Sequence, residues 1–396
     1  MTNLSGIGDD LLQAARDLRD ETVELRRAIH AEPEIGLQLP DTQAKILDAI
    51  TGLDLDITLG ESTTSVVADL DTGRPGPTVL LRGDMDALPL QEDYVSEFQS
   101  QREGVMHACG HDSHVAMLAS AARLLSENRD EFNGKVRFMF QPGEEGYHGA
   151  KYMIEEGVLD GVDRAFALHV VSNVPNGLIA TKSGPLLASA DRWEVTVHGK
   201  GGHASAPHDT IDPIPPAAAM VGNFQTIISR ELDPSQSAVL TVAHIESGTT
   251  NNIIPASAFL EGTMRTFDEG VRNSIHESFH RVAKSTAEAH RCSCTSEVIP
   301  GYPVTVNDAE QAQLTGDVAT ALLGADQFVV MPQPAFAAED FSYVLNQVPG
   351  AMAMMGVCPD DISPEEAAPN HSNFMRVNES AFHNGVALYA GMVMVG

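Results

Sequence analysis

Histidine and cysteine occupy four of the eight positions from 107 to 114 of this sequence, which read His-Ala-Cys-Gly-His-Asp-Ser-His. Thiolate and imidazole groups suit zinc and other late divalent metals. Cys109 and His111 are one residue apart, so a loop could direct both side chains to one point. The segment therefore predicts a metal site. The competing interpretation is a buried cysteine beside a histidine that caps a helix.

Two adjacent glutamates, Glu144 and Glu145, directly follow the apolar segment 136–140. Neighbouring carboxylates at the edge of a core repel each other and are costly unless a cation lies nearby. With a metal present, one could be a ligand while the other accepts a proton from water. Taken alone, the pair would be interpreted as a solvated acidic turn.

Three further candidates lie where predicted strands or turns end. Asp86 follows the strand 78–81 and could orient a metal-binding histidine or bridge two metals. His169 lies in the apolar run 165–170, where a histidine is more often a core residue, and His371 lies in a Pro-Asn turn. Open α/β sheets place ligands at the carboxyl ends of their strands. Two divalent cations sharing a bridging water could be held by Cys109, His111, Glu145, His169 and His371.

The elements that must position these residues alternate between short apolar runs and amphipathic helices, beginning with a helix predicted at 9–31. This alternation predicts an α/β domain with a mixed, mostly parallel sheet, formed by residues 1–184 and 302–396. Between them, residues 185–301 show period-two strands in the order strand, helix, strand, strand, helix, strand. We therefore expect an inserted α+β domain in this segment.

The charge balance narrows the choice of partners. There are 24 Lys and Arg against 55 Asp and Glu, a formal net charge of −31. Such a field repels phosphate backbones and anionic lipid, so nucleic-acid and membrane partners are not expected. The scarcity of lysine is typical of salt-adapted proteins, and an ordinary acidic enzyme is the alternative.

Nothing in the sequence predicts export or membrane insertion. The first ten residues are polar and acidic, and no apolar run approaches the roughly 20 residues of a membrane span. Four cysteines in 396 residues do not predict a disulfide framework. We therefore expect a cytoplasmic protein.

Over almost its whole length the chain resembles the M20 metallopeptidase family, in the amidohydrolase branch that contains hippurate hydrolases, auxin–amino acid conjugate hydrolases and N-acetyl-diaminopimelate deacetylases. The segments that carry the resemblance occur in the family's order: 83–89 (Gly-Asp-Met-Asp-Ala-Leu-Pro), 107–112, 141–145, 168–169, 201–207 (Gly-Gly-His-Ala-Ser-Ala-Pro), 252–255, 262–266, 339–341 and 349–350.

The resemblance implies a site and a reaction. It implies that Cys109, His111, Glu145, His169 and His371 bind two divalent metals, with zinc or manganese expected and cobalt or nickel as alternatives. It further implies that Glu144 is the general base and that Asp86 orients a metal ligand. The expected substrate is a small N-acyl amino acid, hydrolysed at its amide bond.

For the inserted domain, the resemblance implies a homodimer interface. His203 matches a histidine that reaches a neighbouring active site to stabilise the oxyanion, and Asn252 and Arg265 match substrate-binding positions. The chain departs from the pattern at Asn373, where many relatives have an acidic residue, so the surroundings of His371 are less certain than the 107–112 loop.

Other functions remain open at this point. Cys109 could be the nucleophile of a cysteine amidase with His111 as its base, although Glu144, Glu145 and His169 would then have no role. A dipeptidase or carbamoylase on the same scaffold would differ only in its acyl pocket. A non-catalytic dimer that binds small molecules is the alternative outside the enzymes.

Overall fold

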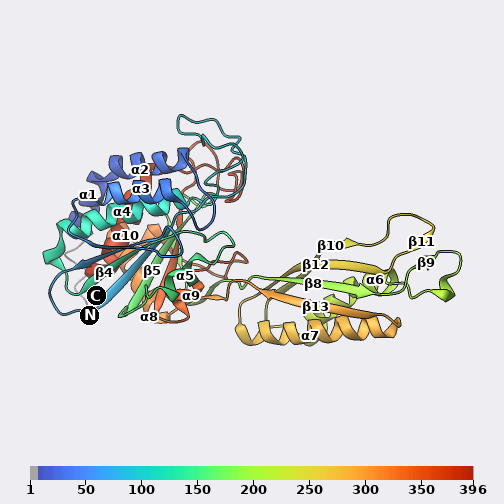
Figure 1. Ribbon diagram of the computed structural model, residues 1–396. Helices are drawn as coiled ribbons and strands as arrows, with labels where there is room; N and C mark the ends of the chain where they lie inside the picture. The colour runs from blue at the N-terminus through green and yellow to red at the C-terminus, as the bar shows by residue number, and fades with distance from the viewer. Residues whose placement is uncertain (1–7, 396) are drawn as a thin grey trace. The chain divides into compact units, whose positions relative to one another are not determined.

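The computed structural model describes residues 8–395, and the chain forms two compact units (Figure 1). The first unit contains the chain up to Leu186, Val306–Gln333 and the chain from Asp340. The second unit contains Leu187–Thr305 and Pro334–Glu339. No helix within residues 8–395 is long and apolar enough to cross a membrane.

An eight-stranded mixed sheet is the centre of the first unit. Four neighbouring strands run parallel to one another, namely β4, β3, β5 and β16, and β6 runs parallel to β15. The antiparallel pairs are β1 with β2, β2 with β4, and β16 with β6. The predicted mixed, mostly parallel sheet is therefore confirmed. In sheet order the strands are β1 (Asp56–Leu59), β2 (Val66–Asp71), β4 (Lys135–Gln141), β3 (Thr78–Asp84), β5 (Arg164–Val171), β16 (Gly350–Gly356), β6 (Ile179–Thr181) and β15 (Phe328–Val330).

Helices cover this sheet because their apolar residues and those of β3, β4 and β5 form one core. Helix α4 packs on β3 and β5, and α10 packs on α4 and β5. Helix α4 is buried along almost its whole length and is rich in Ala and Leu, which are good helix formers. The helices of this unit are α1 (Gly8–Asp17), α2 (Arg19–Ala31), α3 (Pro40–Ala49), α4 (His111–Glu127), α5 (Gly149–Glu155), α8 (Ala309–Leu323), α9 (Ser342–Leu345) and α10 (Phe382–Met394).

The prediction of a single helix at 9–31 is wrong in one respect. The structure has two helices, α1 and α2, which are separated at Leu18. The backbone ψ of Leu18 is −2°, whereas an α-helix requires about −42°. Both halves keep apolar residues toward the core, so the periodicity of the sequence does not reveal the break.

The second unit is an α+β domain, as predicted. Its four-stranded antiparallel sheet has the order β10-β12-β8-β13, and the aromatic rings of Trp193, Phe224 and Phe279 pack together in its core, with centroids 4.9 to 5.4 Å apart. The elements are β8 (Asp191–His198), β9 (Gly202–His203), α6 (Ile214–Thr226), β10 (Ala238–Glu246), β11 (Ile253–Ile254), β12 (Ser257–Thr266), α7 (Glu269–Ala289) and β13 (Ser293–Pro300). Two short strands, β7 (Gly184–Leu187) and β14 (Thr305–Asn307), pair where the chain passes between the units.

Candidate metal centre

The candidate site lies at the carboxyl ends of the parallel strands. Strand β3 ends at Asp84, beside Gln141 at the end of β4, and Glu144 and Glu145 follow within a few residues. Helix α4 begins at His111. Gly110 has φ of 94°, and a Cβ atom there would lie 2.3 Å from Val170 on β5. Glycine at this position therefore allows the loop carrying Cys109 to approach β5 closely.

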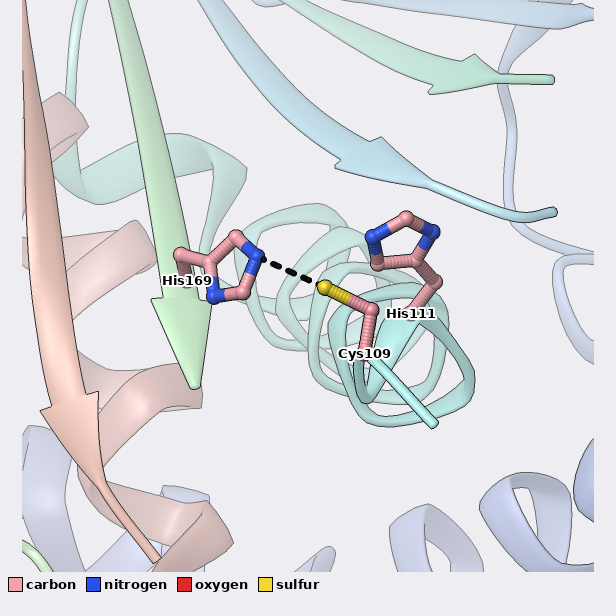
Figure 2. A group of neighbouring side chains, drawn as sticks. All are labelled: Cys109, His111 and His169. Carbon is pink, nitrogen blue, oxygen red and sulfur yellow. Dashed lines mark hydrogen bonds between the residues drawn. The ribbon is translucent and has the colours of Figure 1, made fainter. Parts of the chain in front are cut away.

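Cys109 lies at the centre of the cluster. Its Sγ atom is 3.4 Å from Nε2 of His169, which points toward it from β5, with His111 beside it at the start of α4 (Figure 2). The same sulfur is also 3.3 Å from Nε2 of His371. Two sets of ligand atoms therefore share this one sulfur. They are Cys109 with His111 and His169, and Cys109 with Glu145 and His371, each within 4.8 Å of one another.

The histidine rings are oriented with Nε2 toward the centre. Nδ1 of His111 donates to the Asp86 carbonyl oxygen at 2.8 Å, and Nδ1 of His169 donates to the Val170 carbonyl oxygen at 2.8 Å. Because a carbonyl only accepts, Nδ1 carries the proton in both rings. Burial keeps the pKa of His169 well below its ordinary value, so its Nε2 lone pair is available as a ligand.

One buried polar atom, Nε2 of His111, points into the cluster without a hydrogen-bond partner among residues 8–395, and Asp84 Oδ2 lies 3.4 Å from it. Oε1 of Glu145 is also buried and faces the imidazole of His371, with Nε2 at 3.1 Å. Buried polar atoms are normally satisfied, and both atoms are of types that bind late divalent metals. The donor set therefore fits the two cations that the sequence predicts.

The electrostatics of the cluster favour added positive charge. Hydrogen bonds to Cys109 and Glu145 raise the pKa of His371 to about 10. Burial opposes charge on His111, but Asp84 and Cys109 outweigh it and raise the pKa of His111 well above its ordinary value. Divalent cations would supply the positive charge that these histidines otherwise provide as protons.

Asp86 contacts the site in a way the sequence did not predict. Its carboxylate accepts hydrogen bonds from the backbone N–H groups of Glu144 at 2.9 Å and Glu145 at 3.0 Å. His111 donates to the backbone carbonyl of Asp86, while the carboxylate oxygen Oδ1 lies 3.4 Å from the same ring nitrogen. Asp86 thus holds both glutamates as well as the ring of one candidate ligand.

Glu144 lies beside the ligands and is 5% exposed. Its Oε2 atom is 4.0 Å from Nε2 of His111, and ligand atoms of Glu144, Glu145 and His111 lie within 4.8 Å of one another. A carboxylate in this place can reach a water molecule or a substrate amide at the centre of the cluster.

Sequence reasoning missed the supporting role of Asp84 and His114. Nδ1 of His114 donates to Asp84, and Nε2 of His114 accepts from the Val170 backbone N–H at 2.8 Å. Both ring nitrogens are therefore used, so His114 supports the site and is not a ligand. Asp84 also pairs with the buried Arg82 and lies 3.4 Å from His111 Nε2. The one feature of the sequence that could have indicated this role is the position of Asp84, two residues before Asp86.

The remaining candidates lie in the second unit. His203 and Asn252 are close together because β9 pairs with β11, and the Ala204 N–H donates to the Asn252 carbonyl oxygen at 3.1 Å. Nδ1 of His203 lies 2.8 Å from the Ser205 hydroxyl and accepts from the Ser205 N–H at 3.1 Å. Arg265 lies on β12, in the four-stranded sheet, and donates to the Met264 carbonyl oxygen at 3.0 Å.

Comparisons with known proteins identify the family. The sequence profile described as peptidase family M20/M25/M40 matches residues 80–395. The chain belongs to this family. It is 38% identical over 386 residues to thermostable carboxypeptidase 2 of Saccharolobus solfataricus, covering 96% of this chain and 97% of the relative. It is 40% identical over 343 residues to N-acetyl-L-cysteine deacetylase of Bacillus subtilis, covering 87% of this chain and 82% of the relative.

A solved structure agrees with this assignment. The YxeP protein of Bacillus subtilis, described as a dinuclear metal binding peptidase from the M20 family, has a TM-score of 0.84 and 32% identity, with 96% of this chain and 98% of that chain covered. As a member of the M20 family, the chain is a hydrolase that acts on amide bonds.

Proposed function

We propose that this protein is a metal-dependent amidohydrolase that cleaves the amide bond of N-acyl amino acids. The observation that carries the proposal is the sharing of one sulfur, that of Cys109, by two sets of ligand atoms. In the proposed centre, His111 and His169 would hold one divalent cation and Glu145 and His371 the other, with the thiolate of Cys109 available to both sets. When bound, such a cation pair lowers the pKa of water and polarises the acyl oxygen.

Glu144 performs the proton transfers in this mechanism. Its carboxylate accepts a proton from the water that adds to the acyl carbon, and returns it to the amide nitrogen as the carbon–nitrogen bond breaks. The products are a carboxylate and an amino acid. Asp86 supports this step because it fixes the backbone of Glu144 through a hydrogen bond of 2.9 Å.

His203 is suited to stabilise the oxyanion. The Ser205 N–H donates to its Nδ1 atom, so in the neutral ring the proton lies on Nε2, which becomes a donor. We propose that His203 acts on the site of a second copy in a homodimer formed by the inserted domain. Asn252, beside His203, and Arg265 are the proposed contacts for the substrate's carboxylate or acyl oxygen.

A cysteine-nucleophile mechanism is disfavoured by the surroundings of Cys109. Burial raises the pKa of its thiol, and a reactive thiolate requires a lowered pKa and access to substrate. Removing metal with EDTA and restoring zinc, manganese, cobalt or nickel decides between the mechanisms. The proposed enzyme loses and then regains activity, whereas a thiol enzyme would be unaffected.

A peptidase function is the second candidate, because a carboxypeptidase relative is 38% identical over nearly the whole chain. The deciding experiment compares kcat/KM of the metal-loaded protein on N-acetyl, N-benzoyl and indole-acyl amino acids with that on dipeptides and N-carbamoyl amino acids. We expect the N-acyl amino acids to give the highest values. A preference for dipeptides or carbamoyl compounds would replace the proposed substrate class.

A further inference from the structure

The side chain of Asn370 joins three segments that carry candidate metal ligands. Its Nδ2 atom donates to the carbonyl oxygen of Cys109 at 2.8 Å and to that of Val170 at 3.0 Å. Its Oδ1 atom accepts the backbone N–H of Ser172 at 3.0 Å. One carboxamide thus connects the loop before α4, the end of β5 and the loop that carries His371.

Each of these contacts lies next to a ligand. The Val170 carbonyl oxygen also accepts Nδ1 of His169 at 2.8 Å, so Asn370 fixes the acceptor that orients this ring. The bond to the Cys109 carbonyl oxygen fixes the backbone of the residue whose sulfur lies at the centre. His371 directly follows Asn370, and its own N–H donates to the Ala108 carbonyl oxygen at 2.7 Å.

The backbone at His371 requires such support. Its φ is 66°, in the left-handed region that residues other than glycine seldom adopt. A conformation of this kind persists only where surrounding contacts determine it. The hydrogen bonds of Asn370 on one side and the His371 N–H bond on the other provide those contacts and aim the ring at Cys109.

The chemistry of the contacts specifies an amide. Two carbonyl oxygens face Nδ2, while the N–H and the hydroxyl of Ser172 face Oδ1 at 3.0 and 3.2 Å. The side chain must therefore offer two donors and an acceptor. Aspartate has the same shape but has no hydrogen to donate when ionised, and its charge would face the oxygens of Cys109 and Val170. The isosteric variant N370D therefore separates hydrogen bonding from space filling.

We propose that Asn370 is a positioning residue that sets the mutual placement of Cys109, His169 and His371 around the cation pair. The proposal rests on the proposed function, because it assumes that these three residues are ligands. Asn370 does not itself contact the reacting atoms. It acts through the backbone and ring orientation of the residues that do.

The test is a titration of chelator-stripped protein with Co²⁺, in competition with a chromophoric chelator, while the thiolate-to-cobalt charge-transfer band is recorded. Loss of a partner outside the ligand shell typically weakens metal binding by about 10–100-fold. We expect this loss, with an altered absorption band, in N370D and in N370A, which deletes the same bonds without adding charge. With saturating metal, kcat should fall more than KM changes.

The matched control is N373A, in the same loop, because Asn373 bonds to Asp93 and not to a ligand-bearing segment. The positioning role would be overturned if N370D and N370A matched N373A in both Co²⁺ affinity and absorption spectrum. If N370D does not fold, N370A decides by the same comparison. Failure of the unaltered chain to take up Co²⁺ would instead overturn the proposed metal centre, and the role of Asn370 with it.

Discussion

The Nε2 atom of His371 lies 3.3 Å from the Sγ atom of Cys109, although 262 positions separate the two residues in the chain. Nε2 of His169 lies 3.4 Å from the same sulfur. A sulfur in contact with two imidazole nitrogens can serve two cations at once. This arrangement makes Cys109 the residue on which both proposed ion positions depend.

Replacing Cys109 should therefore disturb both ions, whereas replacing His371 should mainly disturb one. We expect C109A to lower the affinity for both cations by at least about 100-fold, the upper end of the effect of losing an outer partner. The measurement is metal content per chain and titration of the stripped protein. The control is C358A, which removes another buried cysteine, whose sulfur faces the carbonyl oxygens of Pro359 and Ile362 and belongs to none of the ligand groups. Two tightly held ions in C109A would contradict the shared-sulfur arrangement.

Replacing the adjacent residues Glu144 and Glu145 should have different effects. E144Q keeps the proposed ligands but removes the proposed proton acceptor, so kcat should fall by about 10²–10⁴-fold with unchanged metal content. E145Q removes an oxygen of the proposed ligand set, so metal content should fall along with activity. Turnover and metal content measured on the same samples separate the two roles. Equal metal loss in both variants would show that Glu144 is itself a ligand.

Mixing two inactive variants should restore activity if His203 acts on a second copy. H203A lacks the oxyanion donor, which should cost about 10²–10³-fold in kcat, while E144Q lacks the base. In a mixed dimer, one site combines intact Glu144 with His203 of the partner subunit. After random exchange of subunits we expect about a quarter of the unaltered activity. No recovery, despite mixed dimers detected by mass spectrometry, would place His203 in its own site or outside catalysis.

The inserted domain should lose stability in acid because of Asp191. Burial alone would raise the pKa of this carboxyl, but hydrogen bonds from Arg272 and His276 outweigh it and lower the pKa from an ordinary 3.8 to about 2. Arg265 adds a further positive charge nearby. A carboxyl whose pKa is depressed by folding stabilises the fold above its unfolded pKa, and the effect disappears as the pH falls through the folded value.

This contribution amounts to about 2 kcal/mol at neutral pH, at about 1.4 kcal/mol per pKa unit. Trp193, the single tryptophan of the chain, lies in the core of the inserted domain and reports its unfolding by fluorescence. In urea titrations, D191N should be less stable than the unaltered protein at pH 7, and the difference should shrink as the pH falls from the ordinary value of 3.8 to the folded value of about 2. A stability difference independent of pH would contradict the stabilising role of the Asp191 carboxylate. The control is D361N, because Asp361 forms an exposed ion pair.

Salt should stabilise the same domain. Glu194 on β8 lies directly opposite Glu261 on β12 and Glu297 on β13, so three carboxylates form a row across the sheet. Arg192 pairs with Glu194 and Glu261. Glu297 is the most exposed of the three carboxylates. We expect E297Q to stabilise the domain by about 0.2–1 kcal/mol in dilute buffer.

High salt should remove this gain, since about 1 M salt shortens the Debye length to about 3 Å. Denaturation followed through Trp193 at low and high salt is the measurement. Equal stability of the unaltered protein in both buffers would count against adaptation to salt, which the net charge of −31 suggested.

The order and type of the residues were enough to predict which segments carry chemistry and what kind of fold presents them. Apolar runs that alternate with helical periodicity specify strands and helices locally, so the mixed sheet and the inserted α+β domain were predictable. The types of the candidate ligands were also visible, because the loop at 107–112 stands just before a predicted helix and the glutamates at 144–145 directly follow an apolar run.

The way in which these side chains meet could not be predicted, because it depends on contacts between distant segments. The shared position of Cys109, the contact of Asp86 with two backbone N–H groups and the bonds of Asn370 all join residues far apart in the chain. The break at Leu18 likewise leaves the local pattern unchanged. Periodicity records which face of an element is buried, whereas hydrogen-bond partners depend on the packing of whole elements against one another. That packing places the ligands of one centre on a loop, a strand and a turn.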